Sequence, residues 1–280
     1  MNGDDPTIMV VLANPRTEST LIALAGALAQ HEGGRVLATH IVTVPDETPL
    51  DAAAENKDRI GDSSKSLLAA AKADAEAFDV PIETETILSH HGFEGLFDAI
   101  EASGADTVVM GYEGTQFAGG RSEDTLDEQT HRLPCDFLVL DGQEVDISDV
   151  LVPVDESPSS DLSGEVACAL QESVGVDISL LHVADSTDEE VGHDFLREWA
   201  SDHGLSGAEK LVETGDVDSV LGRLGDDYSL VIIGATDRGL LSRIVRGSLT
   251  FDAIHSLDTP VLLTERPSSR SIWKRLLGRR

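Results

Sequence analysis

The chain has 280 residues, with 52 Asp and Glu against 20 Lys and Arg, and a formal net charge of −32 at pH 7. This length suits two domains of ordinary size, and the acidic balance excludes a nucleic-acid or anionic-membrane binder that relies on overall charge. Only five basic residues are lysine, and an acidic, arginine-rich surface suits a salt-rich cytoplasm, where counterions screen self-repulsion. A halophilic source is one interpretation, and an acidic protein from an ordinary cytoplasm is the other.

Apolar runs alternate with helical patterns along the first half of the chain. A helical pattern follows the first run as far as Gly33, and two more cover residues 48–78 and 92–103. The runs that we expect to form strands are residues 7–13, 35–44, 82–88, 107–110 and 137–140. Such alternation is typical of a parallel sheet with helices on both faces.

The same pattern then begins again. Asp155 follows Asn14 by 141 residues, His182 follows His40 by 142, and Gly234 follows Gly111 by 123. The fall in offset from 142 to 123 makes the second copy nineteen residues shorter, mostly between its second and third strands. This internal repeat predicts two domains, residues 1–143 and 147–266, joined by a short polar linker and followed by a tail at 267–280.

A loop in the second repeat has the make-up of an anion site. An apolar run ends at Gly234, and Gly247 and Ser248 precede a helical pattern that starts at Leu249. A glycine after a buried strand lets the backbone approach a ligand, while free N–H groups and a hydroxyl at a helix start bind anions. The alternative is that these glycines serve only turns.

The charges of this loop agree with the first interpretation. Arg238, Arg243 and Arg246 face a single acidic residue, Asp237, so the loop is basic within a very acidic chain. Such a reversal favours a ligand site, although the arginines would also be explained by solvation or by pairing with acidic neighbours.

At these residues the chain resembles the universal stress protein family. Nucleotide-binding members carry Gly, two residues, Gly, nine residues and then Gly-Ser or Gly-Thr, between the fourth strand and the last helix. Gly234 and the Gly247-Ser248 pair stand at that spacing, but Asp237 replaces the middle glycine and Gly239 follows two residues later. A carboxylate there would repel phosphates, so this departure bears on triphosphate binding and not on the fold.

The resemblance implies an α/β fold with two tandem Rossmann-like domains of the adenine nucleotide alpha hydrolase-like type, each with a five-stranded parallel sheet. Family domains usually associate through their last strands. We therefore expect residues 137–140 to pair with 261–264 and form an intrachain pseudo-dimer, which covers two open sheet edges. A further homodimer is compatible with this arrangement and is not required.

The resemblance also implies a nucleotide site in the second repeat, for ATP or another adenine nucleotide, with or without Mg²⁺. Arg238 and Arg243 are added to the site on charge grounds, and an alternative role for Asp155 is to cap the next helix. The residues implied by the resemblance are Pro153, Val154, Asp155, Val183, Gly234, Gly239, Gly247, Ser248 and Leu249.

In the first repeat the corresponding site looks degenerate. Gly111 and Gly114 keep the opening of the family pattern, but Asp124 stands where its closing glycine should be, and Asn14 replaces the aspartate near the adenosine. We expect this repeat to bind a partner instead.

Catalysis and metal binding have little support. His40 and His182 each close a buried strand, where a histidine is more often structural than a ligand. Cys135 and Cys168 lie in apolar contexts and predict core residues, with no metal site. Neither a nucleophile elbow nor a Walker lysine occurs, so we expect no enzyme beyond slow hydrolysis of bound ATP.

No signal peptide or membrane span is predicted, which favours a cytoplasmic protein. The tail contains five basic and no acidic residues, and its apolar residues fall on one helical face, as in an interfacial helix. It could dock on the inner face of the membrane or on a transporter, or fold back on the acidic surface. The tail residues that carry this hypothesis are Trp273, Lys274, Arg275 and Leu276.

Parts of the first repeat look like the universal stress domains that haloarchaeal chains fuse to, or encode beside, amino-acid permeases and other transporters. The expected function is a stress-response regulator that binds an adenine nucleotide and modulates a partner such as a membrane transporter. The alternative is a scaffold that docks on a transporter without binding nucleotide.

Overall fold

A computed structural model describes residues 5–50, 57–112, 135–143, 145–184, 189–235 and 257–266. For residues 57–60, 93 and 94 only the backbone is considered. The helix expected through His131, most of the basic loop after Gly234 and the tail lie outside these ranges.

The first repeat alternates strands and helices as the sequence predicts. Its elements are β1 (Thr7–Leu12), α1 (Pro15–Glu32), β2 (Arg35–Thr43), α3 (Lys57–Ala75), the 3₁₀ turn η1 (Glu76–Phe78), β3 (Ile82–Ser89), α4 (Gly92–Ser103), β4 (Thr107–Gly111) and β5 (Asp136–Asp141). All six residues of β1 are buried, as expected for a strand covered on both faces.

The second repeat follows the same order. Its elements are β6 (Asp149–Pro153), α6 (Pro158–Val174), β7 (Asp177–Ala184), α7 (Glu189–Asp202), β8 (Glu209–Thr214), α8 (Val217–Leu224), the 3₁₀ turn η2 (Gly225–Asp227), β9 (Leu230–Gly234) and β10 (Val261–Glu265). The shorter helix between its second and third strands accounts for part of the difference in length, since α7 has 14 residues and α3 has 19.

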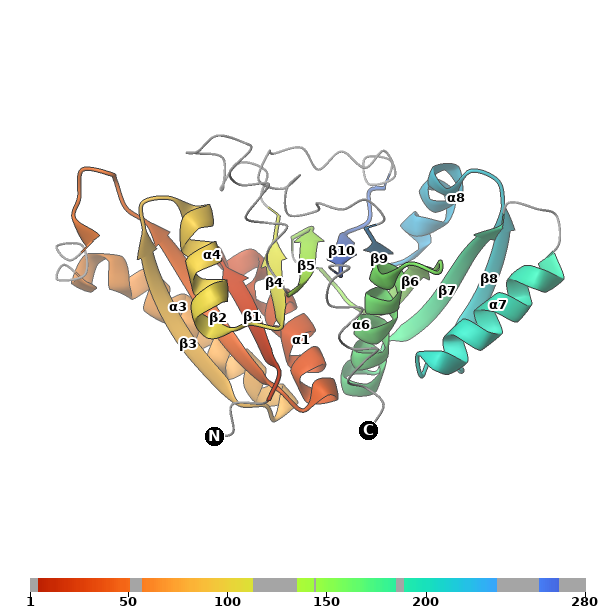
Figure 1. Cartoon of the computed structure of the whole chain (residues 1–280), viewed down its shortest axis with the longest axis horizontal. Coiled ribbons are helices and arrows are strands. Elements are labelled where there is room, and N and C mark those ends of the chain that lie inside the picture. Colours follow the sequence, from red (N-terminus) through yellow and green to blue (C-terminus); the bar gives the residue numbers. More distant parts are fainter. Residues whose placement is uncertain are drawn as a thin grey trace.

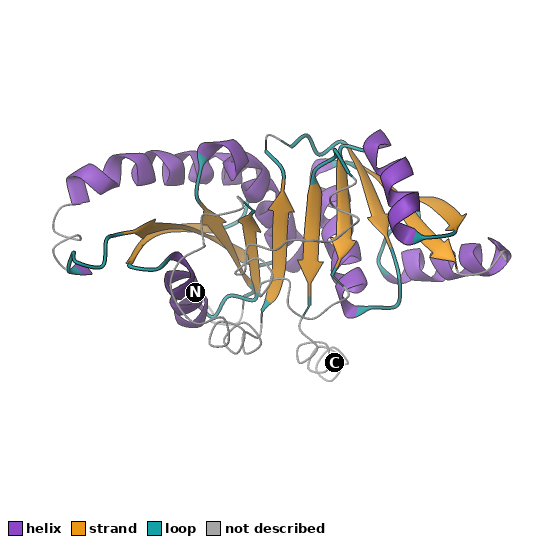
Figure 2. Cartoon of the chain, turned by 90° about the horizontal axis from the view of Figure 1, so that it is seen from above, coloured by secondary structure: helices purple, strands orange, loops and turns teal. Residues whose placement is uncertain are grey.

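The ten strands of the described residues form one sheet, whose strands are the orange arrows of Figure 2. Their order is β3-β2-β1-β4-β5-β10-β9-β6-β7-β8. The strands are parallel within each repeat, and β5 and β10 pair antiparallel at the centre, with Leu262 opposite Leu140. The expected pairing of the last strands in an intrachain pseudo-dimer is therefore confirmed.

Helices cover both faces of this sheet. The largest buried cluster joins α1, α3, α6 and α7 to one face, while α4 and α8 pack on the other. At the centre of the molecule α1 and α6, the first helices of the two repeats, lie against each other (Figure 1). The repeats are thus held by a shared sheet and by a helix pair.

A buried ion cluster crosses the centre of the sheet. Arg266 Nη2 donates to Asp136 Oδ2 at 3.0 Å and to Glu165 Oε2 at 2.6 Å, and the Arg266 and Asp136 side chains are 5% and 2% exposed. Phe137 pairs with Val108 of β4, and Val261 pairs with Val231 of β9, so Phe137 and Val261 are equivalent positions in the two repeats. Gly142 and Arg266 each come five residues later and therefore correspond to each other. The cluster therefore exists on one side of the pseudo-symmetric pair only.

Candidate nucleotide-type pocket at the switch point of the second sheet

In the second repeat the chain passes from β6 to β7 on one side, and β9 lies on the other side of β6. The loops leaving adjacent strands diverge at such a switch point and open a crevice at their carboxyl ends, where α/β folds bind ligands. A pocket of about 240 Å³ lies there. It is lined by Pro153, Val154, Asp155, Ser160, Leu181, His182, Val183, Val217, Asp218, Leu221, Ile233 and Gly234.

Five residues that the sequence singles out meet in this pocket. They come from the ends of three strands and the loop after β6, and are Pro153, Val154, Asp155, Val183 and Gly234. Most of the wall is apolar, since Leu181 and Leu221 contribute buried side chains, and Asp155 and Asp218 add two carboxylates. A mostly apolar pocket with a few polar groups is the usual form of a small-molecule site.

Asp155 is held by the first turn of α6. Its backbone N–H donates to Ser160 Oγ at 3.0 Å, and its Oδ1 accepts from the Ser157 N–H at 2.9 Å. The cap of α6 is Ser157, whose hydroxyl oxygen accepts from the Ser160 N–H. The alternative that Asp155 is the N-cap is therefore wrong, although its Oδ1 does bind the cap residue.

Gly234 is required by packing. A Cβ at this position would lie 2.7 Å from the Ser160 nitrogen and 2.8 Å from the Ser159 carbonyl carbon, closer than atoms can approach. The glycine thus lets the end of β9 sit against the start of α6, which brings two walls of the pocket together. This is a role in forming the site, whether or not the glycine touches a ligand.

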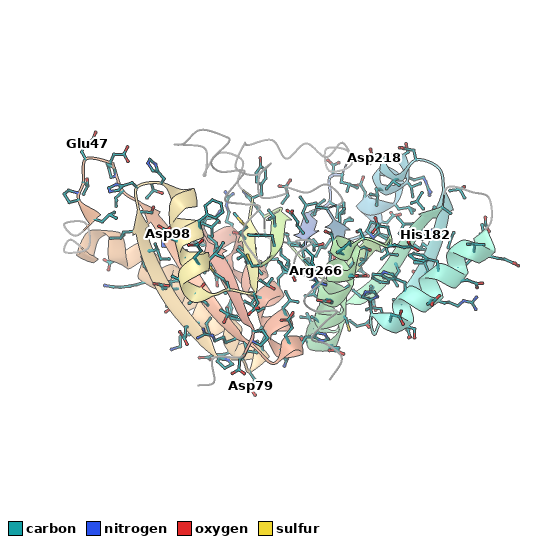
Figure 3. The ribbon with its side chains drawn as sticks, in the orientation of Figure 1. Glu47, Asp79, Asp98, His182, Asp218 and Arg266 are labelled. Carbon is teal, nitrogen blue, oxygen red and sulfur yellow. The ribbon has the colours of Figure 1, made fainter. Side chains whose placement is uncertain are left out.

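His182 lines the pocket as well, although the sequence alone favours a structural role for it. Its Nδ1 donates to the Val154 carbonyl at 3.3 Å, and its ring lies 4.6 Å from that of Phe195 on α7. This hydrogen bond leaves Nε2 as the acceptor of a neutral ring. Figure 3 shows His182 and Asp218 within the second repeat. The signal that could have found it is its place beside Val183 at a strand end.

The first repeat is built differently at the equivalent edge. Asn14 is itself the N-cap of α1, with Oδ1 accepting from the Arg16 N–H at 2.7 Å, and its Nδ2 is buried without a partner among the described residues. His40 Nδ1 is 2.7 Å from Ser64 Oγ, and burial lowers the pKa of His40. The expected structural role of His40 agrees with this contact.

The remaining candidate residues lie outside the described part of the chain. They are Gly114, Arg238, Gly239, Arg243, Gly247, Ser248 and Leu249, with Trp273, Lys274, Arg275 and Leu276 of the tail. Their roles stay predictions.

Cys135 and Cys168 are buried and not in a disulfide, which confirms their assignment to the core. The structure adds a contact that the sequence analysis missed. His31 of α1 lies beside Cys168 and Glu172 of α6, and ligand atoms of the three are within 4.8 Å of one another. Sequence spacing could not show this group, because His31 and Glu172 are 141 residues apart.

The fold and the pocket define a tandem α/β protein of the Rossmann-like class, with a crevice at the carboxyl edge of its second half. Residues 6–141 match the family model described as "Universal stress protein family". The first repeat therefore belongs to this family, and the second repeat has the same strand order, so the chain is a tandem of two such folds.

Solved structures share this architecture over nearly the whole chain. A universal stress protein from Archaeoglobus fulgidus DSM 4304 is 16% identical, with a TM-score of 0.58, and the match covers 94% of this chain and 97% of that one. A putative universal stress protein from Pseudomonas aeruginosa UCBPP-PA14 is 15% identical, with a TM-score of 0.53 and 99% of each chain covered.

The cytoplasmic domain of a prokaryotic cation chloride cotransporter is also similar, at 12% identity and a TM-score of 0.59, with 96% of this chain and 99% of that one covered. At these identities the likeness shows the fold. No curated protein matches the chain. None of the helices that the structure describes is long and apolar enough to cross a membrane.

Proposed function

We propose that the second repeat binds an adenine nucleotide in the switch-point pocket and that its occupancy regulates a partner protein. The observation that carries this proposal is the convergence of Pro153, Val154, Asp155, Val183 and Gly234 on one mostly apolar pocket. These residues come from three separate stretches of the sequence, and the family resemblance implies each of them as a candidate for the site.

The size and charge of the pocket favour the nucleoside part of such a ligand. Its volume of about 240 Å³ is below the range of about 300–1,000 Å³ for pockets that enclose drug-sized ligands. The base would lie against Val154 and Val183, and Asp155 would accept a hydrogen bond from a ribose hydroxyl, since acidic residues hold ribose in this way in related folds.

The phosphates would extend away from the pocket, because Asp155 and Asp218 would repel them. The basic loop that follows β9 in sequence carries Arg238, Arg243 and the Gly247-Ser248 pair, which suit an anion. A bound Mg²⁺ would offset the charge of Asp237 in the same loop.

Regulation requires that the partner distinguish the two states of this loop. Nucleotide can shift affinity for the partner only by its differential binding to those states. The proposed partner is a membrane transporter, and the proposed location is the cytoplasm, either free or at the inner face of the membrane. The likeness to the cytoplasmic domain of a cation chloride cotransporter motivates this choice, as a likeness of fold.

The test is a calorimetric titration of the purified chain with ATP, ADP and AMP, with Mg²⁺ and in molar KCl. Asp155→Ala is expected to weaken binding about 10- to 100-fold, because a hydrogen bond to a charged group contributes about 1.5–3 kcal/mol. Asn14→Ala, at the corresponding edge of the first repeat, should leave the affinity unchanged. Absence of saturable heat for all three nucleotides, with no thermal shift, would reject the proposal.

A second candidate is a scaffold that docks on a transporter without nucleotide. Asp237 favours it, since a carboxylate replaces the glycine expected near the phosphates. Co-sedimentation with anionic and with neutral vesicles, comparing the full chain with one ending at Arg266, tests whether the basic tail contacts a membrane. Equal sedimentation of the two chains would remove the tail from this account.

A further inference from the structure

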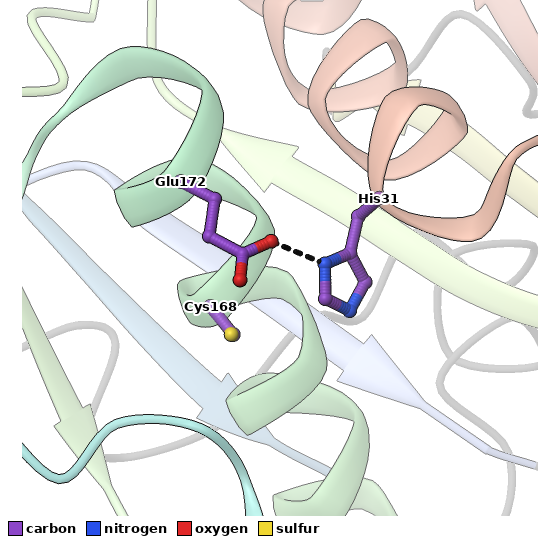
Figure 4. A group of neighbouring side chains, drawn as sticks. All are labelled: His31, Cys168 and Glu172. Carbon is purple, nitrogen blue, oxygen red and sulfur yellow. Dashed lines mark hydrogen bonds and ion pairs between the residues drawn. The ribbon is translucent and has the colours of Figure 1, made fainter.

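Three potential metal ligands meet where the two repeats pack together. His31 lies in the last turn of α1, and Cys168 and Glu172 lie one turn apart on α6, so that residues at i and i+4 share a face. His31 Nδ1 is 2.7 Å from Glu172 Oε2, and Figure 4 shows the Cys168 thiol beside this pair. The three ligand atoms lie within 4.8 Å of one another.

The distances are close to those of a tetrahedral metal centre. Zn–N, Zn–O and Zn–S bonds of about 2.0–2.3 Å place the ligand atoms of such a centre about 3.3–3.8 Å apart. Small rotations of His31 and Glu172 would bring these atoms to that separation, and both side chains are free to rotate in part, with exposures of 32% and 61%.

The donor set selects the class of metal. A thiolate, an imidazole and a carboxylate together match Zn²⁺ and its usual substitute Co²⁺, whereas Mg²⁺ and Ca²⁺ prefer oxygen alone. Cys168 is 5% exposed, so the softest ligand is shielded from solvent while the other two open toward it. A cation could enter from the solvent side and meet the thiol last.

We propose that His31, Cys168 and Glu172 bind one Zn²⁺ per chain, with water as the fourth ligand, and that the ion ties the first repeat to the second. On binding, the Cys168 thiol releases its proton to solvent, and His31 coordinates through a deprotonated Nδ1 with its proton on Nε2. The hydrogen bond between His31 and Glu172 is replaced by two metal bonds. The positive charge of the ion is balanced by one thiolate and one carboxylate.

The pseudo-symmetry of the fold supplies no second copy of this group. Asn14 and Ser157 are the equivalent caps of α1 and α6, so equivalent helix positions differ by 143. Cys168 then corresponds to Ala25, Glu172 to Ala29 and His31 to Val174, none of which is a metal ligand. The expected stoichiometry is therefore one ion.

This site is independent of the proposed nucleotide pocket. Helices of a parallel unit run from the carboxyl edge of the sheet back to its amino edge, so the last turns of α1 and α6 lie at the edge opposite to the pocket. Loss of metal binding would leave the nucleotide proposal intact, and the reverse holds.

Titration of the full chain with Co²⁺ in molar KCl tests the inference, with absorption spectroscopy as the readout. A Co²⁺–thiolate bond gives a charge-transfer band that carboxylates alone cannot give, which separates this site from loose binding to an acidic surface. The band should saturate at one Co²⁺ per chain and disappear when Zn²⁺ is added.

The chain offers a matched control, because it has only two cysteines, both buried. Cys168→Ser should abolish the band and Cys135→Ser should leave it unchanged. His31→Ala and Glu172→Gln should each weaken Co²⁺ binding at least about tenfold, with far-UV circular dichroism showing that each variant is folded.

Zn²⁺ should also raise the unfolding temperature of the wild type and not that of Cys168→Ser. The proposal is overturned if no saturable thiolate band forms, if the band survives Cys168→Ser, or if His31→Ala binds Co²⁺ as tightly as the wild type.

Discussion

The carboxyl ends of β1 and β6 have the same place in the two repeats but different chemistry. Leu12 pairs with His40, and Pro153 pairs with Leu181, which directly precedes His182. Because His40 and His182 are equivalent positions, Leu12 corresponds to Val154. The cap of α1 comes two residues after Leu12, and the cap of α6 comes three residues after Val154. The extra residue in the second repeat lets Ser157 take over capping.

This difference changes which residue caps the helix that follows the strand. Asn14 is the N-cap of α1, while Asp155 precedes the cap of α6, accepts a hydrogen bond from the Ser157 N–H and lines the pocket. A single inserted residue at a strand end is thus enough to present a carboxylate at the switch point without disturbing the helix behind it.

The largest effect is expected at the ion cluster, in which Arg266 and Glu165 of the second repeat meet Asp136 of the first. Arg266→Met should lower the free energy of unfolding by about 3–5 kcal/mol, because it leaves Asp136 and Glu165 without the guanidinium that compensates their charge in a buried site. Denaturant unfolding in molar KCl measures this loss.

The matched control is Arg223→Met, which removes a largely exposed ion pair with Glu213. Such pairs contribute about 0–1 kcal/mol. A loss for Arg266→Met no greater than that of the control would contradict the role given to the cluster at the centre of the sheet.

A pH-dependent difference is expected between Glu18 and Asp161, which are both four residues after their helix caps. Glu18 is buried, and desolvation together with the nearby Asp74 raises its pKa from 4.5 to about 7. A raised pKa means that the folded state holds this proton more tightly, so stability is lost as pH rises from about 4.5 through 7. Glu18→Gln should therefore stabilise the protein by about 1–3 kcal/mol at pH 8 and change little at pH 4.5.

Asp161 instead has a partner, His203, with Oδ1 and Nε2 3.2 Å apart. Burial lowers the pKa of His203, but its hydrogen bonds to Asp161 and to the Trp199 carbonyl outweigh this and raise it. The pair therefore stabilises the fold most below pH 6.5 and less as pH rises, so Asp161→Asn should destabilise mainly at low pH. Urea unfolding at pH 5.5 and pH 8 tests both. A Glu18→Gln variant no more stable than the wild type at pH 8, or an Asp161→Asn variant with the same loss at both pH values, would refute the contrast.

The smallest difference is expected between the glycines that end β4 and β9. Gly234→Ala should cost about 1–3 kcal/mol of stability, since its Cβ would collide with the backbone of Ser159 and Ser160. A Cβ at Gly111 would meet Thr17 Oγ1 at 3.6 Å, an ordinary contact, so Gly111→Ala should change stability by no more than about 0.5 kcal/mol. Thermal unfolding of the two variants checks this, and equal losses would show that the strand ends are packed alike.

The periodic features of the chain were predictable from the sequence. Buried strands such as β1 and β9 are continuous apolar runs, and repetition of the whole pattern implied two similar units that share a sheet. The pairing of β5 with β10 followed from the family resemblance and from the need to cover two sheet edges. Five residues of the pocket were also identified, because the family resemblance implied them, and the structure brings them together where the ends of parallel strands meet at one edge.

Helix contacts between the repeats could not be predicted in this way. His31 meets Cys168 and Glu172 only because α1 packs on α6, and nothing in local sequence specifies that angle or register. The possible capping role of Asp155 was wrong for a related reason, since Asp155, Ser157 and Ser160 all suit a helix start and only the backbone path decides among them. The place of His182 in the pocket was missed because a histidine at a strand end has no signature that separates structural from ligand-facing roles.

The central claim is that the two repeats differ in function, with one nucleotide site per chain and that site in the second. Calorimetric titration with ATP and Mg²⁺ in molar KCl, on the wild type, Val183→Trp and Ile41→Trp, tests it most directly. Val183 lines the pocket and Ile41 is its counterpart, 142 residues earlier in the strand register. We predict one site for the wild type and for Ile41→Trp, and none for Val183→Trp, whose larger side chain fills the pocket. Two sites in the wild type, or binding lost in Ile41→Trp and retained in Val183→Trp, would contradict the account.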